Sequence, residues 1–275
     1  MKIKPVLKWV GGKSAIAHLI LKSFPAKFGK YYEPFLGGGA IAFSLPRYKQ
    51  KYLGDINQDL IDFYKVLQYQ PDELFFELTK AKKYYDDPKI DNQVFFLNVR
   101  EIDRKLDWRS QYSLVERAAR LIYLNRTCFN GLWRVNSKGQ NNSPFGNYET
   151  LNFDFDNLKR LSFFLNHNVN LYSWGYKWTC VSAERGDLIY LDPPYDPLPG
   201  KKAVAYNSTT FDQTELKNFV DELTERGCHV VLSNAATPLI LDLYRDYKIE
   251  FINARRSIAA NGDRSLAKEV IITNF

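Results

Sequence analysis

Short apolar strands alternate with helical segments at both ends of this 275-residue chain, and this alternation constrains the fold more than any other feature. Five segments are predicted strands because they are short, apolar and bounded by turn residues. They are KYYEPF at 30–35, KYLGDIN at 51–57, GDLIYLD at 186–192, CHVVLSN at 228–234 and EVIITNF at 269–275. The pattern predicts an α/β fold with a largely parallel sheet covered by helices on both faces, and an antiparallel orientation is open for the last strand.

The strand rhythm stops between about Tyr69 and Phe155. Three segments there, at 71–85, 92–106 and 113–126, carry apolar residues at helical spacing. They lead into residues 127–150, which are rich in Asn, Gly and aromatic residues and favour neither helix nor strand. We therefore expect one domain formed by residues 1–68 and 154–275, with an inserted, mainly helical subdomain at residues 69–153.

Composition favours an acidic partner and gives no sign of a metal site. Lys and Arg exceed Asp and Glu by 38 to 31, a net charge of +7 that suits nucleic acid. The three cysteines, Cys128, Cys180 and Cys228, form no C-x-x-C pair, so neither a metal centre nor a disulfide framework is predicted. No stretch has the length and apolarity of a membrane span or signal peptide. We expect a cytoplasmic monomer without metal or membrane contact.

A glycine-rich turn follows the first predicted strand. EPFLGGGA places Gly37, Gly38 and Gly39 between a strand and a helix, where the backbone can approach a ligand because no Cβ intervenes. Asp55 ends the next strand about eighteen residues later and can accept both hydroxyls of a ribose. The G-x-G-x-x-G spacing of dinucleotide-binding folds is absent. A ribose-bearing ligand without a pyrophosphate, such as S-adenosylmethionine, therefore fits better.

The stretch GGKS at 11–14 is similar to a phosphate-binding loop but lacks the earlier glycine of that motif, because position 7 is leucine. No strand of convincing length precedes it. We expect Trp9 and Lys13 instead to lie in a tight turn that closes over a pocket.

The segment Asp192-Pro193-Pro194-Tyr195 follows the apolar run of a predicted strand. Proline alone would end a strand, because it donates no backbone hydrogen bond and restricts the preceding residue to extended conformations. A carboxylate, a rigid turn and an aromatic residue at the carboxyl end of a strand also present polar groups to a ligand in open α/β sheets. Both interpretations stay open on these four residues alone.

Seven motifs in order resemble those of the Dam-type DNA adenine methyltransferases, and together they cover nearly the whole chain. They are LKWVGGK, EPFLGGG, DIN, LNRTCFNGLWRVNSKG, PFGNY, DPPYDPL and RRSIAANG. The resemblance implies a Rossmann-like methyltransferase sheet, and methyl transfer from S-adenosylmethionine to the 6-amino group of adenine in double-stranded DNA. The target in this family is usually GATC. The resemblance leaves open whether a partner restriction endonuclease acts on the same site, and no contact with such a partner is expected. It also leaves open whether the gene is bacterial or phage-borne.

The resemblance also assigns residues to the reaction. The catalytic residues are Asp192, Pro193, Pro194 and Tyr195. The cofactor-binding residues are Trp9, Lys13, Phe35, Gly37, Gly39, Asp55 and Asp192. Hydrogen bonds from the adenine amine to an Asp192 oxygen and the Pro193 carbonyl would favour a tetrahedral nitrogen aimed at the methyl group. Tyr195 would stack on an adenine that has swung out of the duplex, since the target atom is unreachable inside it.

A further set of residues is expected to contact DNA. It comprises Lys8, Phe129, Asn130, Leu132, Arg134, Pro144 and Tyr148, together with Arg255, Arg256 and Arg264 in a basic hairpin at 254–269. Arg134 can bond a guanine bidentately, Asn130 can pair with adenine, and Leu132 or Pro144 can meet a thymine methyl. Phe129, where relatives often carry tyrosine, could wedge into the space left by the flipped base. Surface ion pairs and a solvated charged hairpin are the structural alternatives.

Two other functions share part of this sequence pattern. A methyltransferase acting on structured RNA would keep the cofactor half, but the residues of 127–150 argue against it. A catalytically idle DNA-binding regulator would keep the fold, and the intact motifs at Gly37–Gly39, Asp55 and Asp192–Tyr195 argue against that.

Overall fold

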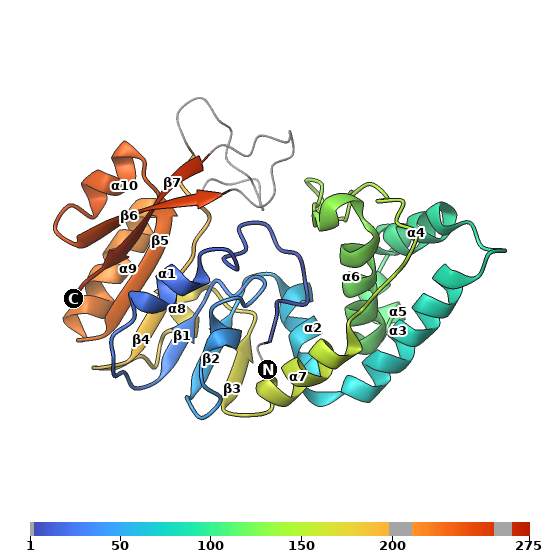
Figure 1. Ribbon diagram of the computed structural model, residues 1–275, viewed down its shortest axis with the longest axis horizontal. Coiled ribbons are helices and arrows are strands. Elements are labelled where there is room, and N and C mark those ends of the chain that lie inside the picture. The colour runs from blue at the N-terminus through green and yellow to red at the C-terminus, as the bar shows by residue number, and fades with distance from the viewer. Residues whose placement is uncertain (1–2, 198–210, 256–265) are drawn as a thin grey trace. The chain divides into compact units, whose positions relative to one another are not determined.

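The computed structural model describes residues 3–197, 211–255 and 266–275, and the chain forms two compact units (Figure 1). The helical unit consists of Met1–Gly12 and Asn57–His167, and the sheet unit of Lys13–Ile56 and Asn168–Phe275. The helical unit is therefore larger than the predicted insertion at residues 69–153. The reason is that α2 (Gln58–Tyr69) and α7 (Phe155–Leu165) pack on α3 (Pro71–Asp86), so both belong with the helices that lie between them in sequence.

One sheet forms the centre of the sheet unit, as predicted, and it has seven strands rather than the five that the sequence indicated. Its strands are β1 (Tyr31–Glu33), β2 (Lys51–Gly54), β3 (Val169–Tyr172), β4 (Leu188–Leu191), β5 (His229–Ala235), β6 (Lys248–Arg255) and β7 (Leu266–Thr273). The strand order is β3-β2-β1-β4-β5-β7-β6. All neighbouring pairs are parallel except those of β7, which runs antiparallel between β5 and β6. The sheet is the Rossmann-like methyltransferase sheet that we expected, with the last strand reversed.

Helices cover both faces of this sheet, because side chains of a strand point alternately to opposite faces. On one face, Ile189 and Leu191 of β4 pack in a buried cluster with residues of α9 (Gln213–Glu225) and α10 (Pro238–Leu243). On the other face, Tyr31 of β1 and Tyr190 of β4 contact Phe24, which follows α1 (Ala17–Lys22). The same alternation places Glu33, Asp192 and Ser233 on the face of Tyr31 and Tyr190, toward the carboxyl ends of their strands.

The helical unit is built around α6 (Leu114–Thr127), which packs against α2, α3 and α4 (Asn92–Glu101). The helix begins at a capping box in which Ser113 and Glu116 satisfy each other's backbone N–H groups. The remaining short helical elements of the described chain are η1 (Ala42–Ser44), η2 (Ile102–Arg104), α5 (Trp108–Gln111), η3 (Phe129–Gly131) and α8 (Tyr176–Thr179). Among the described residues, no helix combines the length and apolarity needed to cross a membrane.

Candidate active site and nucleic-acid interface

The strand order reverses direction between β1 and β4, and three of the predicted motifs lie at this position. In open α/β sheets a ligand binds outside the carboxyl ends of the strands at such a switch point. The glycine turn follows β1, Asp55 follows β2, and Asp192 follows β4 directly. The structure therefore brings the predicted cofactor and catalytic motifs to one edge of one sheet.

The glycine turn is fixed by Asp55. The Gly37 N–H donates to Asp55 Oδ2 at 2.9 Å, so the carboxylate at the end of β2 holds the turn after β1. Gly37 has φ 48° and Gly39 has φ 69°, a backbone region that disfavours every residue with a Cβ. At Gly39 an added Cβ would lie 2.2 Å from the ring of Phe43. The turn therefore depends on glycine for its conformation and for space.

The Asp192 carboxylate lies in a polar cluster of the sheet unit. Its Oδ1 atom is 2.8 Å from Lys13 Nζ and accepts a hydrogen bond of 2.8 Å from Ser233 Oγ. Tyr190 OH lies 3.0 Å from the same Ser233 oxygen. Lys13 Nζ also lies 4.6 Å from the centre of the Tyr195 ring, a cation–π distance. One buried lysine thus contacts both the carboxylate and the aromatic ring of the predicted catalytic segment.

The backbone of residues 192–195, hereafter the DPPY turn, is held from one side. Gln213 Nε2 donates to the Pro194 carbonyl at 2.8 Å, and Gln213 Oε1 accepts from Asn234 Nδ2 at 3.1 Å. Both amide side chains are buried. Among the described residues, none donates a hydrogen bond to the neighbouring Pro193 carbonyl. The carbonyl predicted to accept the amine therefore has acceptor capacity left, whereas the next one is occupied.

Glu33, the acidic residue of the EPFLGGG motif, is buried beside this cluster. It is 2% exposed, and Tyr31 OH donates to its Oε2 at 2.7 Å. Burial raises the pKa of Glu33 to about 8, and the nearby Asp192 charge acts in the same direction. The Glu33 carboxyl is consequently protonated over much of the neutral range.

This buried carboxyl predicts a pH-dependent stability. The pKa of Glu33 is about 8 in the folded chain, whereas its ordinary value is 4.5. Between these two values the folded chain binds the proton more tightly than the unfolded chain does. The contribution of Glu33 to the free energy of unfolding therefore falls as pH rises from 4.5 to about 8. Urea unfolding at about pH 6 and about pH 9 should show a larger loss of stability in wild type than in Glu33→Gln. Glu250→Gln, an exposed residue of β6, is the matched control. Equal pH slopes in wild type and Glu33→Gln would contradict the assignment.

The remaining predicted cofactor residues divide between the two units. Phe35 stacks on Tyr176 at 5.6 Å in the sheet unit, next to the glycine turn. Trp9, by contrast, belongs to the helical unit, where it is 9% exposed and stacks on Trp133 at 6.3 Å. Its ring therefore has a packing role that the sequence did not reveal.

Two exposed apolar side chains beside Asp55 were not predicted. Ile56 follows β2 and is 72% exposed, and Trp174 follows β3 and is 50% exposed. Their strands are neighbours, because Gly54 pairs with Tyr172. An isolated exposed apolar residue needs no explanation, but two at adjacent strand ends next to Asp55, the predicted ribose-binding acid, form a candidate wall for a flat ring.

All seven predicted DNA contacts outside the basic hairpin lie in the helical unit, at Lys8 and on residues 127–150, hereafter the recognition loop after its predicted role. Lys8 is clamped to the loop by the buried Asn125, which accepts from Lys8 N at 2.9 Å and donates to Lys8 O at 2.8 Å. The Lys8 side chain also fills the space above Gly131. This clamp could not be predicted from the sequence, because its partners are 117 residues apart.

The start of the recognition loop, directly after α6, presents Phe129 and Asn130. Phe129 is 55% exposed, and its N–H donates to the Pro144 carbonyl at 2.9 Å. Asn130 has φ 56°, which asparagine tolerates better than most residues, and its N–H donates to Tyr148 OH at 3.0 Å. Leu132 is tied to the same loop through Ser143 Oγ, which donates to its carbonyl at 2.8 Å.

A buried ion pair anchors the middle of the loop. Asp103 Oδ2 accepts from Asn141 N at 2.8 Å and pairs with Arg120 Nη2 at 2.8 Å, and both charged side chains are less than a tenth exposed. The anchor joins the loop to η2 and α6. It therefore gives a segment with little regular structure a defined conformation.

Arg134 is oriented by a neighbour in the same loop. Its Nε donates to Asn142 Oδ1 at 2.8 Å, and its Nη2 donates to the Asn142 carbonyl at 2.9 Å. A guanidinium has five N–H donors. These two bonds occupy one edge of the fork and leave the Nη1 edge for a further acceptor, so the predicted bidentate contact with guanine is compatible with the observed orientation.

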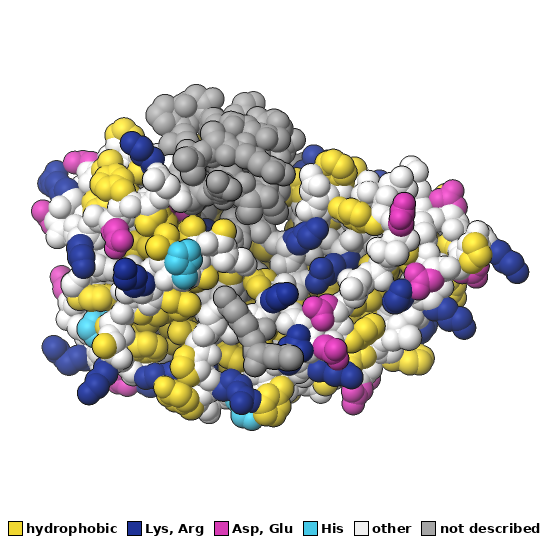
Figure 2. Space-filling model, viewed as in Figure 1, with side chains coloured by type: hydrophobic (Ala, Val, Ile, Leu, Met, Phe, Trp, Pro, Cys, Tyr) yellow, Lys and Arg dark blue, Asp and Glu magenta, His cyan; other side chains and the backbone are white. Residues whose placement is uncertain are grey.

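The basic hairpin is described only in part. Arg256 and Arg264 lie outside the described residues, and Arg255 is the last residue of β6. On the face shown in Figure 2, Lys and Arg side chains are spread over both units, interspersed with acidic ones. Charge distribution by itself therefore does not mark an interface on that face.

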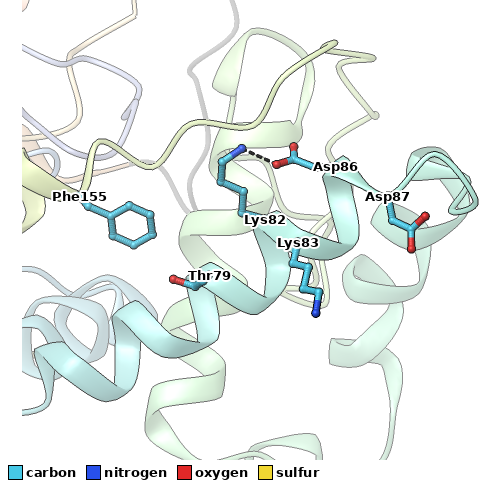
Figure 3. Close-up of a pocket in the computed structure, with 6 residues that line it drawn as sticks. All are labelled: Thr79, Lys82, Lys83, Asp86, Asp87 and Phe155. Atoms are coloured by element: carbon cyan, nitrogen blue, oxygen red, sulfur yellow. Dashed lines mark hydrogen bonds and ion pairs between the residues drawn. The ribbon is translucent and has the colours of Figure 1, made fainter.

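A hollow of about 500 Å³ on the helical unit contains none of the predicted site residues. It is lined by Thr79, Lys82, Lys83, Asp86, Asp87 and Phe155. Figure 3 shows that Lys82 points to Asp86, with which it forms an ion pair of 2.6 Å. Because these charges neutralise each other locally, we assign no ligand to this hollow.

The fold and the site define a Rossmann-like methyltransferase with a helical, loop-bearing second unit. The chain belongs to the D12 class N6 adenine-specific DNA methyltransferase family, whose model matches residues 9–258. Its reaction is therefore the methylation of adenine in DNA. Within the part of the chain that the structure describes, no group of His, Cys, Asp and Glu side chains is arranged to hold a metal ion.

Curated relatives resemble the chain over its whole length. It is 35% identical to the type II methyltransferase M1.LlaDCHI of Lactococcus lactis subsp. cremoris, over 100% of this chain and 96% of the relative. It is 34% identical to the type II methyltransferase M.MjaIII of Methanocaldococcus jannaschii, over 100% of both chains. It is 31% identical to the DNA adenine methylase of Escherichia coli strain K12, over 95% of this chain and 91% of the relative.

Proposed function

We propose that this enzyme transfers the methyl group of S-adenosylmethionine to the 6-amino group of an adenine flipped out of duplex DNA, within the sequence GATC. The observation that carries the chemistry is the convergence of the glycine turn, Asp55 and the DPPY turn at the switch point of the sheet. The family assignment supports DNA rather than structured RNA as the substrate, and an adenine-modifying enzyme rather than an idle regulator.

The residues present fit the proposed cofactor. The Gly37–Gly39 turn offers backbone without a Cβ, and the Asp55 carboxylate at the end of β2 suits the two ribose hydroxyls. Ile56 and Trp174 would flank the adenine ring of the cofactor. When bound, S-adenosylmethionine supplies an electrophilic methyl group on a sulfonium.

The DPPY turn would prepare the nucleophile. The lone pair of an adenine amine is delocalised into the ring, so hydrogen bonds to the Asp192 carboxylate and the Pro193 carbonyl would favour a tetrahedral nitrogen. Lys13 and Ser233 orient the Asp192 carboxylate, because both donate to its Oδ1. Asp192 need not be a strong base, since departure of the sulfide drives the transfer and the proton can leave afterwards. The face of Tyr195 opposite Lys13 would stack on the flipped base.

The recognition loop would read the target. Lys8 and Arg134 suit guanines, Asn130 suits an adenine, and Leu132 with Pro144 suits a thymine methyl. Phe129, exposed at the start of the loop, would fill the gap in the duplex. Arg255, Arg256 and Arg264 would contact phosphates, which position the protein without reading sequence.

Mapping the methylated bases tests this proposal directly. The protein would be incubated with unmethylated genomic DNA and S-adenosylmethionine, and modified adenines located by single-molecule sequencing. We expect methylation of the adenine in GATC. Modification at another fixed sequence would overturn the target but keep the chemistry, whereas cofactor binding without any adenine methylation would overturn the chemistry.

Arg134→Ala should weaken discrimination at one guanine of the target by about 1–3 kcal/mol, because a bidentate contact is lost. The measurement is kcat/KM on duplexes in which each base pair is replaced in turn. Asn142→Ala should give a smaller loss at the same position, since it frees the Arg134 side chain. Arg109→Ala, on the surface of the helical unit, is the control. An unchanged preference in Arg134→Ala would refute direct readout by this residue.

A further inference from the structure

The Tyr195 ring of the DPPY turn is held at its hydroxyl end by a residue from a strand that carries none of the predicted site residues. Tyr195 OH donates to Glu269 Oε2 at 2.9 Å. Glu269 lies on β7, opposite Ala235 at the carboxyl end of β5. Because β7 runs antiparallel to its neighbours, its first residues lie at the edge where the parallel strands end. The reversal of one strand thus delivers a carboxylate to the candidate active site.

The same ring is held at a second point. Lys13 Nζ lies 4.6 Å from the ring centre and 2.8 Å from Asp192 Oδ1. A tyrosine side chain has two rotatable bonds, so a contact at one face and a hydrogen bond at the tip together restrict both its position and its tilt. The contact with Lys13 constrains the face of the ring, whereas the bond to Glu269 constrains its tip.

We propose that Glu269 is a positioning residue that fixes the tilt of the Tyr195 ring, so that the face opposite Lys13 is parallel to the incoming adenine. This inference rests on the proposed stacking role of Tyr195. A hydrogen bond from a phenol to a carboxylate is stronger than one between neutral groups and holds a narrower geometry. Without it the ring would still stack on the base, but in many orientations that carry the amine away from Asp192 and the Pro193 carbonyl.

A structural role alone would give a different result. If Glu269 only satisfied a half-buried hydroxyl, its loss would lower the stability of the fold and leave turnover of the folded fraction unchanged. A positioning role predicts a lower kcat with little change in the KM for DNA, together with a weaker signal from the flipped base. The two can therefore be separated by measuring turnover and base flipping on folded protein.

The experiment is a double-mutant cycle on Tyr195→Phe and Glu269→Ala, with Glu269→Gln as the conservative variant. Each single change should lower kcat about tenfold, the size expected for one hydrogen bond to a charged group. The double variant should be no slower than either single variant, since both remove the same bond. Glu269→Gln, which keeps an acceptor, should stay within about threefold of wild type. Fluorescence of 2-aminopurine at the target adenine should fall in step with kcat, and Glu250→Ala, on β6, should match wild type.

Several results would overturn the proposal. Wild-type turnover and 2-aminopurine signal in folded Glu269→Ala would do so, and so would single effects that multiply to about a hundredfold in the double variant. Thermal unfolding verifies the folded state of each variant, and Tyr195→Phe tests the bond from the other side if Glu269→Ala does not fold. Tyr195→Ala separates the two levels of the argument. Full activity in that variant would overturn the proposed stacking role, whereas its inactivity beside a fully active Glu269→Ala would overturn only the role of Glu269.

Discussion

Asp192→Ala is expected to abolish adenine methylation while leaving the fold and most DNA affinity intact. The carboxylate is the proposed acceptor for the amine, and loss of one such preorganised group typically costs on the order of 10²–10³ in turnover. The change also leaves Lys13 Nζ without its carboxylate partner in a site where the lysine side chain is only 8% exposed. We therefore expect the loss to reach the upper end of that range or exceed it.

Asp192→Asn separates the loss of the negative charge from the loss of the side chain. It keeps the shape and an acceptor for Ser233, and like Asp192→Ala it removes the charge that Lys13 contacts. Methylation is measured by transfer of labelled methyl groups, DNA affinity by fluorescence anisotropy and the fold by circular dichroism. Asp242→Ala, an exposed residue of α10, serves as the control. Substantial turnover in both folded Asp192 variants would refute the assigned role.

Gly39→Ala is expected to destabilise the sheet unit and to remove measurable cofactor binding. The residue has φ 69°, and the added Cβ would lie 2.2 Å from a ring atom of Phe43. The positive φ costs about 1–2 kcal/mol, and forced displacement of packed side chains costs about 1–3 kcal/mol more. Relief of the clash would move the glycine turn, and with it the Gly37 N–H that Asp55 holds.

Gly186→Ala is the matched control for this substitution. Gly186 has φ 85°, but an added Cβ there would have no atom within 4 Å. It therefore carries the cost of the backbone conformation without the clash, and it lies outside the proposed cofactor site. Urea unfolding and calorimetric titration with S-adenosylmethionine measure the two effects. Equal stability of the two variants, with normal cofactor affinity in Gly39→Ala, would contradict the argument.

Much of the sheet could be predicted from sequence because its central strands are buried on both faces. β1, β2, β4 and β5 appear as short apolar runs, and the turn after each is marked by glycine, aspartate or proline. β3 and β6 were not predicted. The sequence of β3 is only VNLY, and that of β6, KIEFINAR, belongs to an edge strand in which Phe251 is 60% exposed. Both depend on pairing with neighbours, which one sequence does not display.

Only those residues of the candidate site that lie in sequence motifs could be predicted. The glycine turn, Asp55 and Asp192 meet at one sheet edge as expected, and the loop residues from Phe129 to Tyr148 form one cluster with Lys8. Residues that support these groups from distant parts of the chain were missed. Ser233, Glu269 and Asn125 are examples. Each contacts a site residue that lies at least 41 residues away in the sequence.

The division of the chain has a practical consequence for exchanging target specificity between relatives. The polypeptide passes between the two units three times, after Gly12, after Ile56 and after His167, so neither unit is a continuous segment. A chimaera that received only residues 57–167 would carry the recognition loop but not Lys8. Asn125 would then bind the amino-terminal segment of the recipient protein instead of its own. A graft that moves both pieces together is the one that should transfer a sequence preference intact.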